Sequence, residues 1–293
     1  PYIGRFAPSP SGPLHFGSLV AALASYLDAR AHGGAWLLRI DDLDPPREVP
    51  GAAQKIIDAL RCHGLQWDGE ICWQSQRVAA YDSALKILQH HHLVYFCDCT
   101  RAMLAELGGA YQGHCRDRGL AGDTPSACRL RLDERIISFT DLFQGPQSCC
   151  PRIEGGDFVI RRKDRLYAYQ LAVVVDDAGS GITHVVRGAD LIESCGRQIY
   201  LQQVLGLDTP VYGHVPVAST VDGRKLSKQN LSPAIERHAA LDNLLAALRF
   251  LGQAVPAQPQ ANTAGLLRWA IVHWDRNRVP RKMALTHKEH GWA

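Results

Sequence analysis

Hydrophobic and polar positions along the chain follow two alternating periods, which predict strands and helices in turn. An apolar run predicts a buried strand at residues 36–40, and apolar residues at helical spacing predict helices over 51–64 and 78–88. The longer apolar run at 166–177 predicts another buried strand, and 182–191 a further strand and turn. Strands alternating with helices are typical of a parallel sheet covered by helices, so the pattern predicts an α/β protein.

The pattern divides the chain into segments. Between Tyr95 and Gly156 it becomes rich in cysteine and turn residues, which indicates a small, separately built insertion. Helical spacing returns at 241–251 and 266–271, on either side of a Pro/Gln/Ala linker. We therefore expect four segments: a first half of the sheet domain at 1–94, the insertion at 95–157, the second half at 158–232, and a helical subdomain at 233–293.

The stretch RFAPSPSGPLHFGS at residues 5–18 predicts a strand, a stiff loop and a helix start. Its three prolines restrict the backbone, whereas Gly12 and Gly17 permit tight turns or a close approach to a ligand. The apolar spacing after Gly17 predicts a helix with Ser18 as its N-cap. Amides at such a helix start attract anions, most often phosphate, although an ordinary turn before a surface helix is the alternative.

Composition limits the possible classes of protein. With 293 residues, 46% of them hydrophobic and 21% charged, the chain can form two or more globular subdomains. The net charge of +3 is too small to indicate a nucleic-acid binder by itself. No apolar run approaches a membrane span and no secretory pattern begins the chain, so we expect a cytoplasmic protein without a membrane partner. An odd number of cysteines, nine, argues for thiols rather than a disulfide framework.

Two distant signals become specific when they are considered together. They are His15-Phe16-Gly17-Ser18 near the start and Lys225-Leu226-Ser227-Lys228-Gln229 much later. In this order they resemble the HIGH and KMSKS signatures of class I aminoacyl-tRNA synthetases. The stretches GRFAPSPSGPLHFGS, LRIDDLD, VVVDDAGSGITHVVRGADL and GRKLSKQ resemble the glutamyl-tRNA synthetase branch, over roughly residues 2–232. The resemblance implies a Rossmann-type parallel sheet, split by a zinc-bearing insertion and followed by a helical subdomain.

The resemblance also implies the chemistry of amino-acid activation. This reaction joins a carboxylate to the α-phosphate of ATP, so the protein must supply positioning and charge stabilisation rather than a general base. The catalytic residues implied are His15, Lys225 and Lys228. The residues implied for binding ATP, which enters with Mg²⁺, are Pro8, His15, Gly17, Ser18, Lys225, Leu226, Ser227 and Lys228.

Glutamate carries two carboxylates and therefore needs cations, for which the planar fork of arginine is well suited. The glutamate-binding residues implied by the resemblance are Arg5, Ala7, Ser9, Asp41, Tyr169 and Arg187. Two positions depart from the family. Asp41 replaces the glutamate expected to contact the substrate ammonium, and Val173 replaces a pocket asparagine, which suggests weaker glutamate binding.

Cysteines in the insertion have the spacing of a metal site. Cys97, Cys99 and Cys115 lie close enough in sequence to surround one ion, and zinc is the natural metal for thiolates. A closed structural site needs a fourth ligand, for which generic chemistry favours His114. The short relatives of glutamyl-tRNA synthetase imply Tyr111 instead, through a Tyr-x-Gly-x-Cys pattern. Unliganded thiols in a small core are the alternative, and the other six cysteines are expected to be packing residues.

The short stretch after Lys228 suggests an RNA substrate. A conventional glutamyl-tRNA synthetase continues with domains that read the anticodon, whereas residues 229–293 suffice only for a helical subdomain. The chain therefore resembles truncated paralogues that attach glutamate to the queuosine base in the anticodon of aspartate tRNA. The partners implied are L-glutamate, ATP and the anticodon stem-loop of tRNA(Asp), bound by a monomer.

Two other functions remain open at this point. One is a conventional ligase acting on the tRNA acceptor end, and the other is a non-catalytic paralogue that binds RNA or nucleotide. Retention of Arg5, His15, Lys225 and Lys228 argues against the second. Basic clusters at 161–165 and 276–282 could contact phosphate, although such clusters are more often solvated surface.

Overall fold

The protein is described by a computed structural model. It describes residues 1–122, 125–219, 235–258 and 260–286. The expected ATP-binding residues Lys225, Leu226, Ser227 and Lys228, and the expected turn at Asp222 and Gly223, lie outside the described residues.

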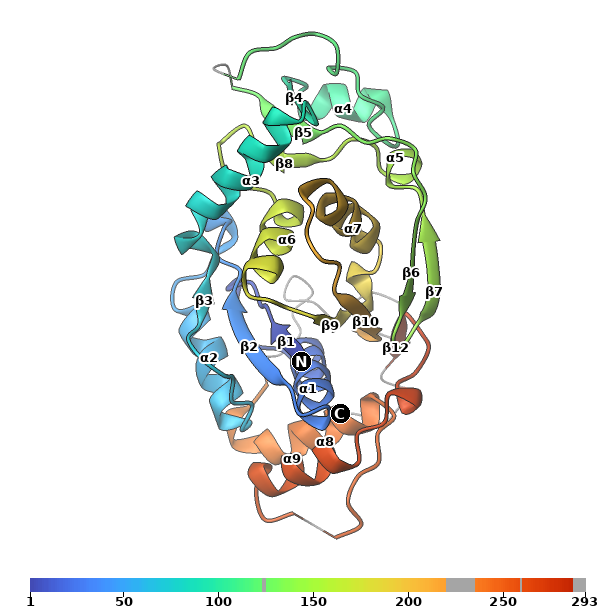
Figure 1. Cartoon of the computed structure of the whole chain (residues 1–293). Helices are drawn as coiled ribbons and strands as arrows, with labels where there is room; N and C mark the ends of the chain where they lie inside the picture. The colour runs from blue at the N-terminus through green and yellow to red at the C-terminus, as the bar shows by residue number, and fades with distance from the viewer. Residues whose placement is uncertain (123–124, 220–234, 259, 287–293) are drawn as a thin grey trace.

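Parallel strands form the centre of the molecule, as Figure 1 shows. Strands β1 (Ile3–Phe6), β2 (Ala35–Ile40) and β3 (Cys72–Trp73) pair in parallel, as do β9 (His184–Gly188) and β10 (Val211–Val215). The backbone amide of Thr183 donates to the Ile3 carbonyl at 2.9 Å, which brings the start of β9 beside β1. The predicted α/β class with a parallel sheet is confirmed.

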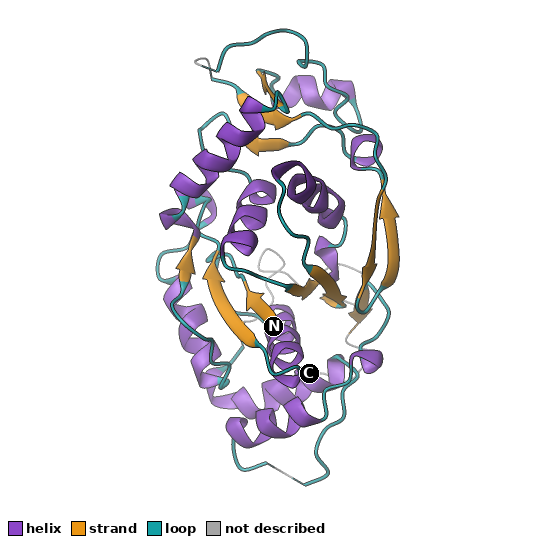
Figure 2. Cartoon of the chain, in the orientation of Figure 1, coloured by secondary structure: helices purple, strands orange, loops and turns teal. Residues whose placement is uncertain are grey.

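Helices cover these strands, as Figure 2 shows. They are α1 (Phe16–Ala31), α2 (Ala52–Cys62), α3 (Val78–His90), α6 (Tyr169–Gly179) and α7 (Ser194–Leu205). Helix α1 is buried on most of its surface, since Leu19, Leu23 and Leu27 are fully enclosed between β1, β9 and the C-terminal helices. The helices predicted over 51–64 and 78–88 are confirmed.

The strand predicted over residues 166–177 is wrong, because most of this run forms α6. Leu171, Ala172, Val173 and Val174 are all buried, where α6 packs against α3 and α7. A helix enclosed on several sides carries the same uninterrupted apolar run as a buried strand, so periodicity could not separate the two.

Antiparallel strands set the insertion apart from the parallel sheet. Strands β4 (Val94–Cys97), β5 (Ala127–Leu130) and β8 (Val159–Arg161) form one antiparallel sheet, at the top of Figure 1. A hairpin of β6 (Ile137–Asp141) and β7 (Gly145–Cys149) runs down one side. Two short helices accompany them, α4 (Arg101–Leu107) and α5 (Pro151–Glu154).

The C-terminal part is helical, as its spacing predicts. Helices α8 (Ala240–Phe250) and α9 (Thr263–Val272) pack against α1, and Leu244, Leu248 and Leu266 lie in the same core. Strand β12 (Ala284–Thr286) pairs in parallel with β11 (Val217–Ser219). Short 3₁₀ turns occupy Pro45–Arg47, Gln74–Gln76, Ala189–Leu191, Arg237–Ala239 and Arg276–Arg278. Among the described residues no helix is both long and apolar enough to span a membrane.

Candidate active site

The loop after β1 ends in a helix start whose cap is a histidine. His15, rather than the expected Ser18, is the N-cap of α1, and its Nδ1 accepts the backbone N–H of Ser18 at 3.3 Å. Its Nε2 lies 3.0 Å from the Ser18 hydroxyl oxygen. Because Nδ1 accepts a hydrogen bond, the neutral imidazole carries its proton on Nε2. That proton is directed at the Ser18 hydroxyl oxygen, and both side chains lie at the positive end of α1, which favours a bound anion.

A cavity of about 390 Å³ lies at the carboxyl ends of β1, β2 and β9. This is the edge at which open parallel sheets bind ligands. The cavity is lined by every described residue that the resemblance assigns to glutamate or ATP: Arg5, Ala7, Pro8, Ser9, His15, Gly17, Ser18, Asp41, Tyr169 and Arg187. Residues far apart in the sequence, from Arg5 to Arg187, therefore meet in one place.

The floor of this cavity is a chain of buried ion pairs that we call the Asp177 cluster: Arg5, Arg39, Asp41 and Asp177. Arg5 donates Nε and Nη2 to the two Asp177 oxygens at 3.1 and 3.2 Å. Arg39 donates to Asp177 at 2.6 Å and to Asp41 at 2.6 Å. Burial raises the pKa of Asp177, but Arg5 and Arg39 outweigh it and hold that pKa below its usual range. The carboxylate therefore stays charged and fixes both guanidinium groups.

Arg187 differs from these arginines because it has no carboxylate partner among the described residues. Its Nε donates to His214 Nε2 at 3.0 Å, Nη1 to the Tyr169 hydroxyl at 3.3 Å, and Nη2 to the Cys195 sulfur at 3.2 Å. All three acceptors are neutral groups, and Arg187 is buried. A buried cation without an anionic partner is a suitable binding group for a substrate carboxylate.

A buried histidine–aspartate pair contacts Arg187 and positions its guanidinium group. His214 Nδ1 lies 2.5 Å from Asp141 Oδ2, and both side chains are fully buried. Because Arg187 donates to Nε2, the imidazole must be neutral with its proton on Nδ1, facing Asp141. Burial lowers the pKa of His214 and so does Arg187, although the bond to Asp141 opposes them.

The structure changes the interpretation of several residues. Asp41 lines the cavity but is engaged by Arg39 within its own β2 segment. Val173 lies in the core between α3 and α6 and does not line the cavity. Cys195 is a buried packing residue, as expected, and it also contacts Arg187, whereas Cys62 is exposed rather than packed. Sequence analysis missed Asp177, Arg39, His214 and Asp141, because no local spacing links them to their partners.

Three buried thiols in the insertion form a possible metal site. The sulfur atoms of Cys97, Cys99 and Cys115 all lie within 4.8 Å of one another. The Tyr111 hydroxyl lies 3.4 Å from the Cys97 sulfur and 3.9 Å from the Cys99 sulfur, whereas His114 is exposed. Burial raises the pKa of Cys97, but hydrogen bonds with Tyr111 and Arg129 outweigh it and bring the pKa to about 7. These four side chains could hold a metal ion.

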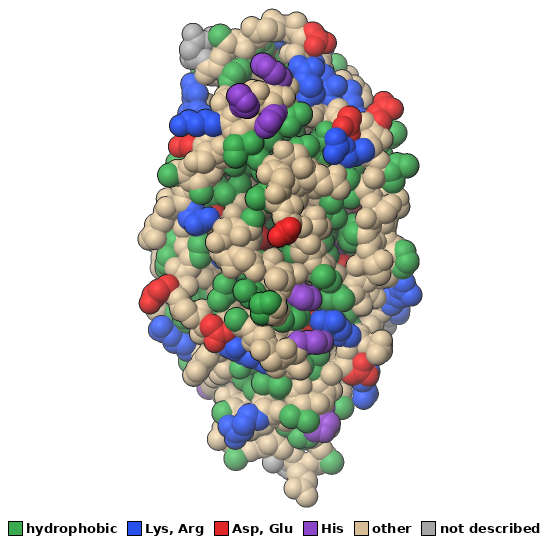
Figure 3. Space-filling model, viewed as in Figure 1, with side chains coloured by type: hydrophobic (Ala, Val, Ile, Leu, Met, Phe, Trp, Pro, Cys, Tyr) green, Lys and Arg blue, Asp and Glu red, His purple; other side chains and the backbone are tan. Residues whose placement is uncertain are grey.

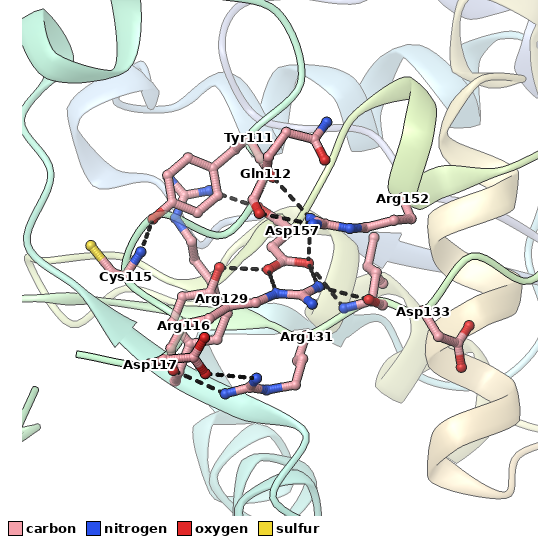
Figure 4. A network of polar contacts seen from close by, with 12 residues as sticks. Tyr111, Gln112, Cys115, Arg116, Asp117, Arg129, Arg131, Asp133, Arg152 and Asp157 are labelled. Carbon is pink, nitrogen blue, oxygen red and sulfur yellow. Dashed lines mark hydrogen bonds and ion pairs between the residues drawn. The ribbon is translucent and has the colours of Figure 1, made fainter. Parts of the chain in front are cut away.

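Tyr111 also contacts a second ion-pair cluster, which is centred on Asp157 and drawn in Figure 4. The buried Asp157 carboxylate accepts from Arg116 at 2.5 Å and from the Tyr95 hydroxyl at 2.6 Å. The Asp157 carbonyl accepts from Arg129 at 2.7 Å, and the Arg129 guanidinium stacks 3.9 Å from the Tyr111 ring. We call these residues the Asp157 cluster: Tyr95, Tyr111, Arg116, Arg129, Arg152 and Asp157.

Each of the two basic clusters of the sequence has one arginine that pairs with an acidic group. Arg162 bonds Asp44 at 3.0 Å, and Arg276 bonds the buried Asp28 at 2.7 Å. Figure 3 shows basic and histidine side chains gathered over the upper part of one face, where the insertion lies. Only part of the expected basic surface is therefore available for phosphate.

Comparison with known proteins defines the class of protein. A family described as "tRNA synthetases class I (E and Q), catalytic domain" matches residues 3–254. The chain belongs to this family, and its α/β fold is that of class I glutamyl-tRNA synthetases.

Individual relatives narrow the comparison further. A "Glutamyl-Q tRNA(Asp) synthetase" from Pseudomonas paraeruginosa is 53% identical over 287 residues, which cover 97% of both chains. One with the same name from Serratia proteamaculans is 50% identical and covers 98% of this chain and 95% of its own. Among solved structures, a glutamate tRNA ligase from Elizabethkingia meningosepticum in complex with its amino acid matches with a TM-score of 0.81 and 25% identity. This match covers 97% of the present chain and 66% of the ligase.

Proposed function

We propose that this chain activates L-glutamate with ATP and transfers the glutamyl group to the queuosine base in the anticodon of tRNA(Asp). The observation that supports the activation step is the cavity itself. It brings together the N-terminus of α1, His15 and Arg187, which has no carboxylate partner among the described residues. The acceptor is supported by the printed name of relatives that match over nearly their whole length.

Activation needs electrostatics and positioning rather than a general base. An oxygen of the glutamate α-carboxylate attacks the α-phosphorus of ATP, and pyrophosphate leaves with the electrons of the broken P–O bond. The amides that begin α1 receive the phosphate charge together with the Ser18 hydroxyl, which the Nε2–H of His15 polarises. Lys225 and Lys228 add cations to the same triphosphate, which enters with Mg²⁺, and no tRNA is needed for this step.

Glutamate recognition follows from the charges of the cavity. Arg187 binds one substrate carboxylate, with the Tyr169 hydroxyl beside it. Arg5 gives Nε and Nη2 to Asp177, so its Nη1 faces the second carboxylate. Asp41, together with Ala7 and Ser9, lines the side of the cavity that takes the ammonium group.

A zinc ion bound by Cys97, Cys99, Cys115 and Tyr111 orders the insertion. Zinc–thiolate bonds of about 2.3 Å require sulfur atoms about 3.8 Å apart in a tetrahedron, and the Cys99 and Cys115 sulfurs lie 3.5 Å apart. The Tyr111 hydroxyl is buried against these thiols, which supports it over the exposed His114 as fourth ligand. The metal then acts structurally, between the two halves of the sheet domain.

In the transfer step, a hydroxyl oxygen of the queuosine cyclopentene diol attacks the carbonyl carbon of the adenylate. The bond from that carbon to the phosphate oxygen breaks, AMP leaves, and the hydroxyl proton passes to the departing phosphate. This vicinal diol resembles the ribose diol that ordinary synthetases acylate, so one adenylate serves either acceptor and the shape around the site selects between them.

The experiment is transfer of labelled glutamate to tRNA(Asp) prepared with and without queuosine, beside tRNA(Glu) as a control. The proposal expects label only on the queuosine-containing tRNA(Asp), in a bond that mild base hydrolyses. Equal labelling of the queuosine-free tRNA, or strong labelling of tRNA(Glu), would show a conventional ligase. Absence of both activation and transfer would show a non-catalytic paralogue.

A further inference from the structure

A second cavity adjoins the active site. It has a volume of about 560 Å³, within the range of about 300–1,000 Å³ that takes a drug-sized molecule. It shares Ser9, Asp41 and Tyr169 with the first cavity, so the two cavities adjoin at these residues. The first cavity already contains the helix start and both substrate arginines, which leaves the second for another reactant.

Carboxylates line this second cavity, and one of them is uncompensated. Asp41 is engaged by Arg39 at 2.6 Å, and Asp44 pairs with both Arg47 and Arg162. Glu48 has no ion pair with any described residue, and its Oε1 is buried without a hydrogen-bond donor among them. A buried acceptor without a donor is rare in folded proteins and points to a missing partner. The partner that suits it is a cationic N–H donor.

Arginines form the rim of the same cavity. The Arg47 side chain is 76% exposed and that of Arg162 is 38% exposed, although both contact Asp44. Exposed guanidinium groups at the mouth of a cavity can meet phosphate oxygens. The second cavity therefore combines a negative interior with a positive rim, which suits a ligand with a cation at its tip and anions behind it.

We propose that the second cavity receives the acceptor nucleobase, with Glu48 accepting a hydrogen bond from its cationic amine. A queuosine base carries a secondary amine, protonated at neutral pH, between its deazaguanine ring and the cyclopentene diol. With the amine at Glu48, the diol lies toward Asp41 and Tyr169, where the second cavity adjoins the first and can reach the adenylate. The flanking phosphates then meet Arg47 and Arg162. This assignment rests on the proposed function and identifies where that function selects its RNA.

The electrostatic match also explains selection against an ordinary acceptor end. A terminal adenosine presents the same vicinal diol and the same phosphates, but it has no cation for Glu48. It would leave the buried carboxylate oxygen without a donor, which is a large penalty for a site built on a hydrogen bond.

The test separates the two half-reactions in Glu48→Gln. Glutamate-dependent ATP–pyrophosphate exchange uses only the first cavity and stays within about twofold of wild type, which also shows that the variant is folded. The kcat/KM for transfer to queuosine-containing tRNA(Asp) falls about 10- to 100-fold, as expected for loss of a charge-assisted hydrogen bond. Glu70→Gln, an exposed change of the same chemistry before β3, leaves both reactions unchanged.

A competitor tRNA tests the cationic amine separately from the acceptor diol. tRNA(Asp) with 7-aminomethyl-7-deazaguanine at the same position keeps a cationic amine but lacks the acceptor hydroxyls. It should inhibit transfer by wild type more strongly than tRNA with unmodified guanine, and Glu48→Gln should remove that advantage. If Glu48→Gln disturbs folding, Arg47→Ala offers a second variant at the exposed rim, expected to raise the KM for tRNA severalfold and not to alter exchange.

Two outcomes overturn the assignment while the proposed function stands. In one, Glu48→Gln transfers glutamate to queuosine as well as wild type. In the other, the aminomethyl competitor is no better than guanine. Failure of the proposed function looks different, because wild type itself would then label tRNA(Glu) or queuosine-free tRNA(Asp).

Discussion

The Asp177 cluster and the Asp157 cluster are two versions of the same arrangement. Each has a buried aspartate held by more than one arginine. The Asp177 cluster joins residues from β1, β2 and α6, and it lines an open cavity. The Asp157 cluster joins residues of the insertion and closes around the Tyr111 ring and backbone (Figure 4).

The two regions differ in which groups their arginines contact. Arg5 and Arg187 both line the cavity, and Arg187 has no carboxylate partner among the described residues, so the first region presents positive charge. In the second region Arg116, Arg129 and Arg152 bond Asp157 or stack on Tyr111, so the positive charge is consumed inside the protein. Under the proposed function, ion pairs therefore serve binding in the first region and rigidity in the second.

Removing each central carboxylate should therefore give the largest and most different effects. Asp177→Ala leaves the buried Arg5 without an ion pair, which should lower the free energy of unfolding by about 3–5 kcal/mol. Asp157→Ala removes the acceptor of Arg116 and Arg152, which are only partly buried, so its effect on stability should be smaller. At a temperature where both variants stay folded, Asp177→Ala should lose glutamate activation because Arg5 loses its ion-pair partner, although Arg39 keeps Asp41. Asp157→Ala should retain it. Urea unfolding and ATP–pyrophosphate exchange measure the two effects, and equal loss of exchange in both variants would contradict the comparison.

Substitution of Arg187, which has no carboxylate partner among the described residues, should give the next largest effect. Arg187→Lys keeps a positive charge but loses the fork that bonds His214, Tyr169 and Cys195 together. The expected result is a fall of about 10- to 100-fold in kcat/KM for glutamate, mostly in KM, with ATP affinity unchanged. Arg135→Lys, at an exposed arginine outside the cavity, is the matched control. Unchanged glutamate kinetics in Arg187→Lys would exclude Arg187 from the binding site.

Removal of the metal tests whether zinc orders the insertion. The purified protein should contain about one zinc per chain, and Cys99→Ala should lose it along with the protease resistance of the insertion. His114→Ala should keep the zinc, whereas Tyr111→Phe should weaken its retention against a chelator. A stable wild-type chain free of metal would reject the site, and zinc loss in His114→Ala with retention in Tyr111→Phe would reverse the fourth ligand.

The smallest expected effect is a pH dependence through His214. Its folded-state pKa lies below 6.5, so the neutral form is favoured on folding and stability is lost as pH falls below 6.5. Asp141, whose pKa is also lowered despite its burial, acts in the same direction at lower pH. Protonation of His214 would place a cation against Arg187, so the KM for glutamate should rise as the pH falls below 6.5. His214→Gln should flatten this KM profile, and an unchanged profile would dismiss His214 as the positioning residue.

Short-range patterns predicted much of this molecule. The loop and helix around His15, the helices after 51 and 78, and the cysteine group of the insertion all depend on residues near one another in sequence. The Asp177 cluster could not be predicted, because Arg39 and Asp177 meet only through packing of β2 against α6. Packing of α6 against α3 and α7 buries 171–174 on several sides, so this helix carries the uninterrupted apolar run of a buried strand. His15 replaced Ser18 as the N-cap because an imidazole nitrogen also accepts a backbone N–H.

Glutamate-dependent ATP–pyrophosphate exchange without any RNA tests the central claim most directly. The account predicts exchange with glutamate and ATP alone, because Arg187, Arg5 and the start of α1 already form the site within the chain. Adding tRNA should not be required and glutamine should not substitute, since it lacks the second carboxylate. Exchange that begins only after tRNA is added, or none with any amino acid, would contradict it.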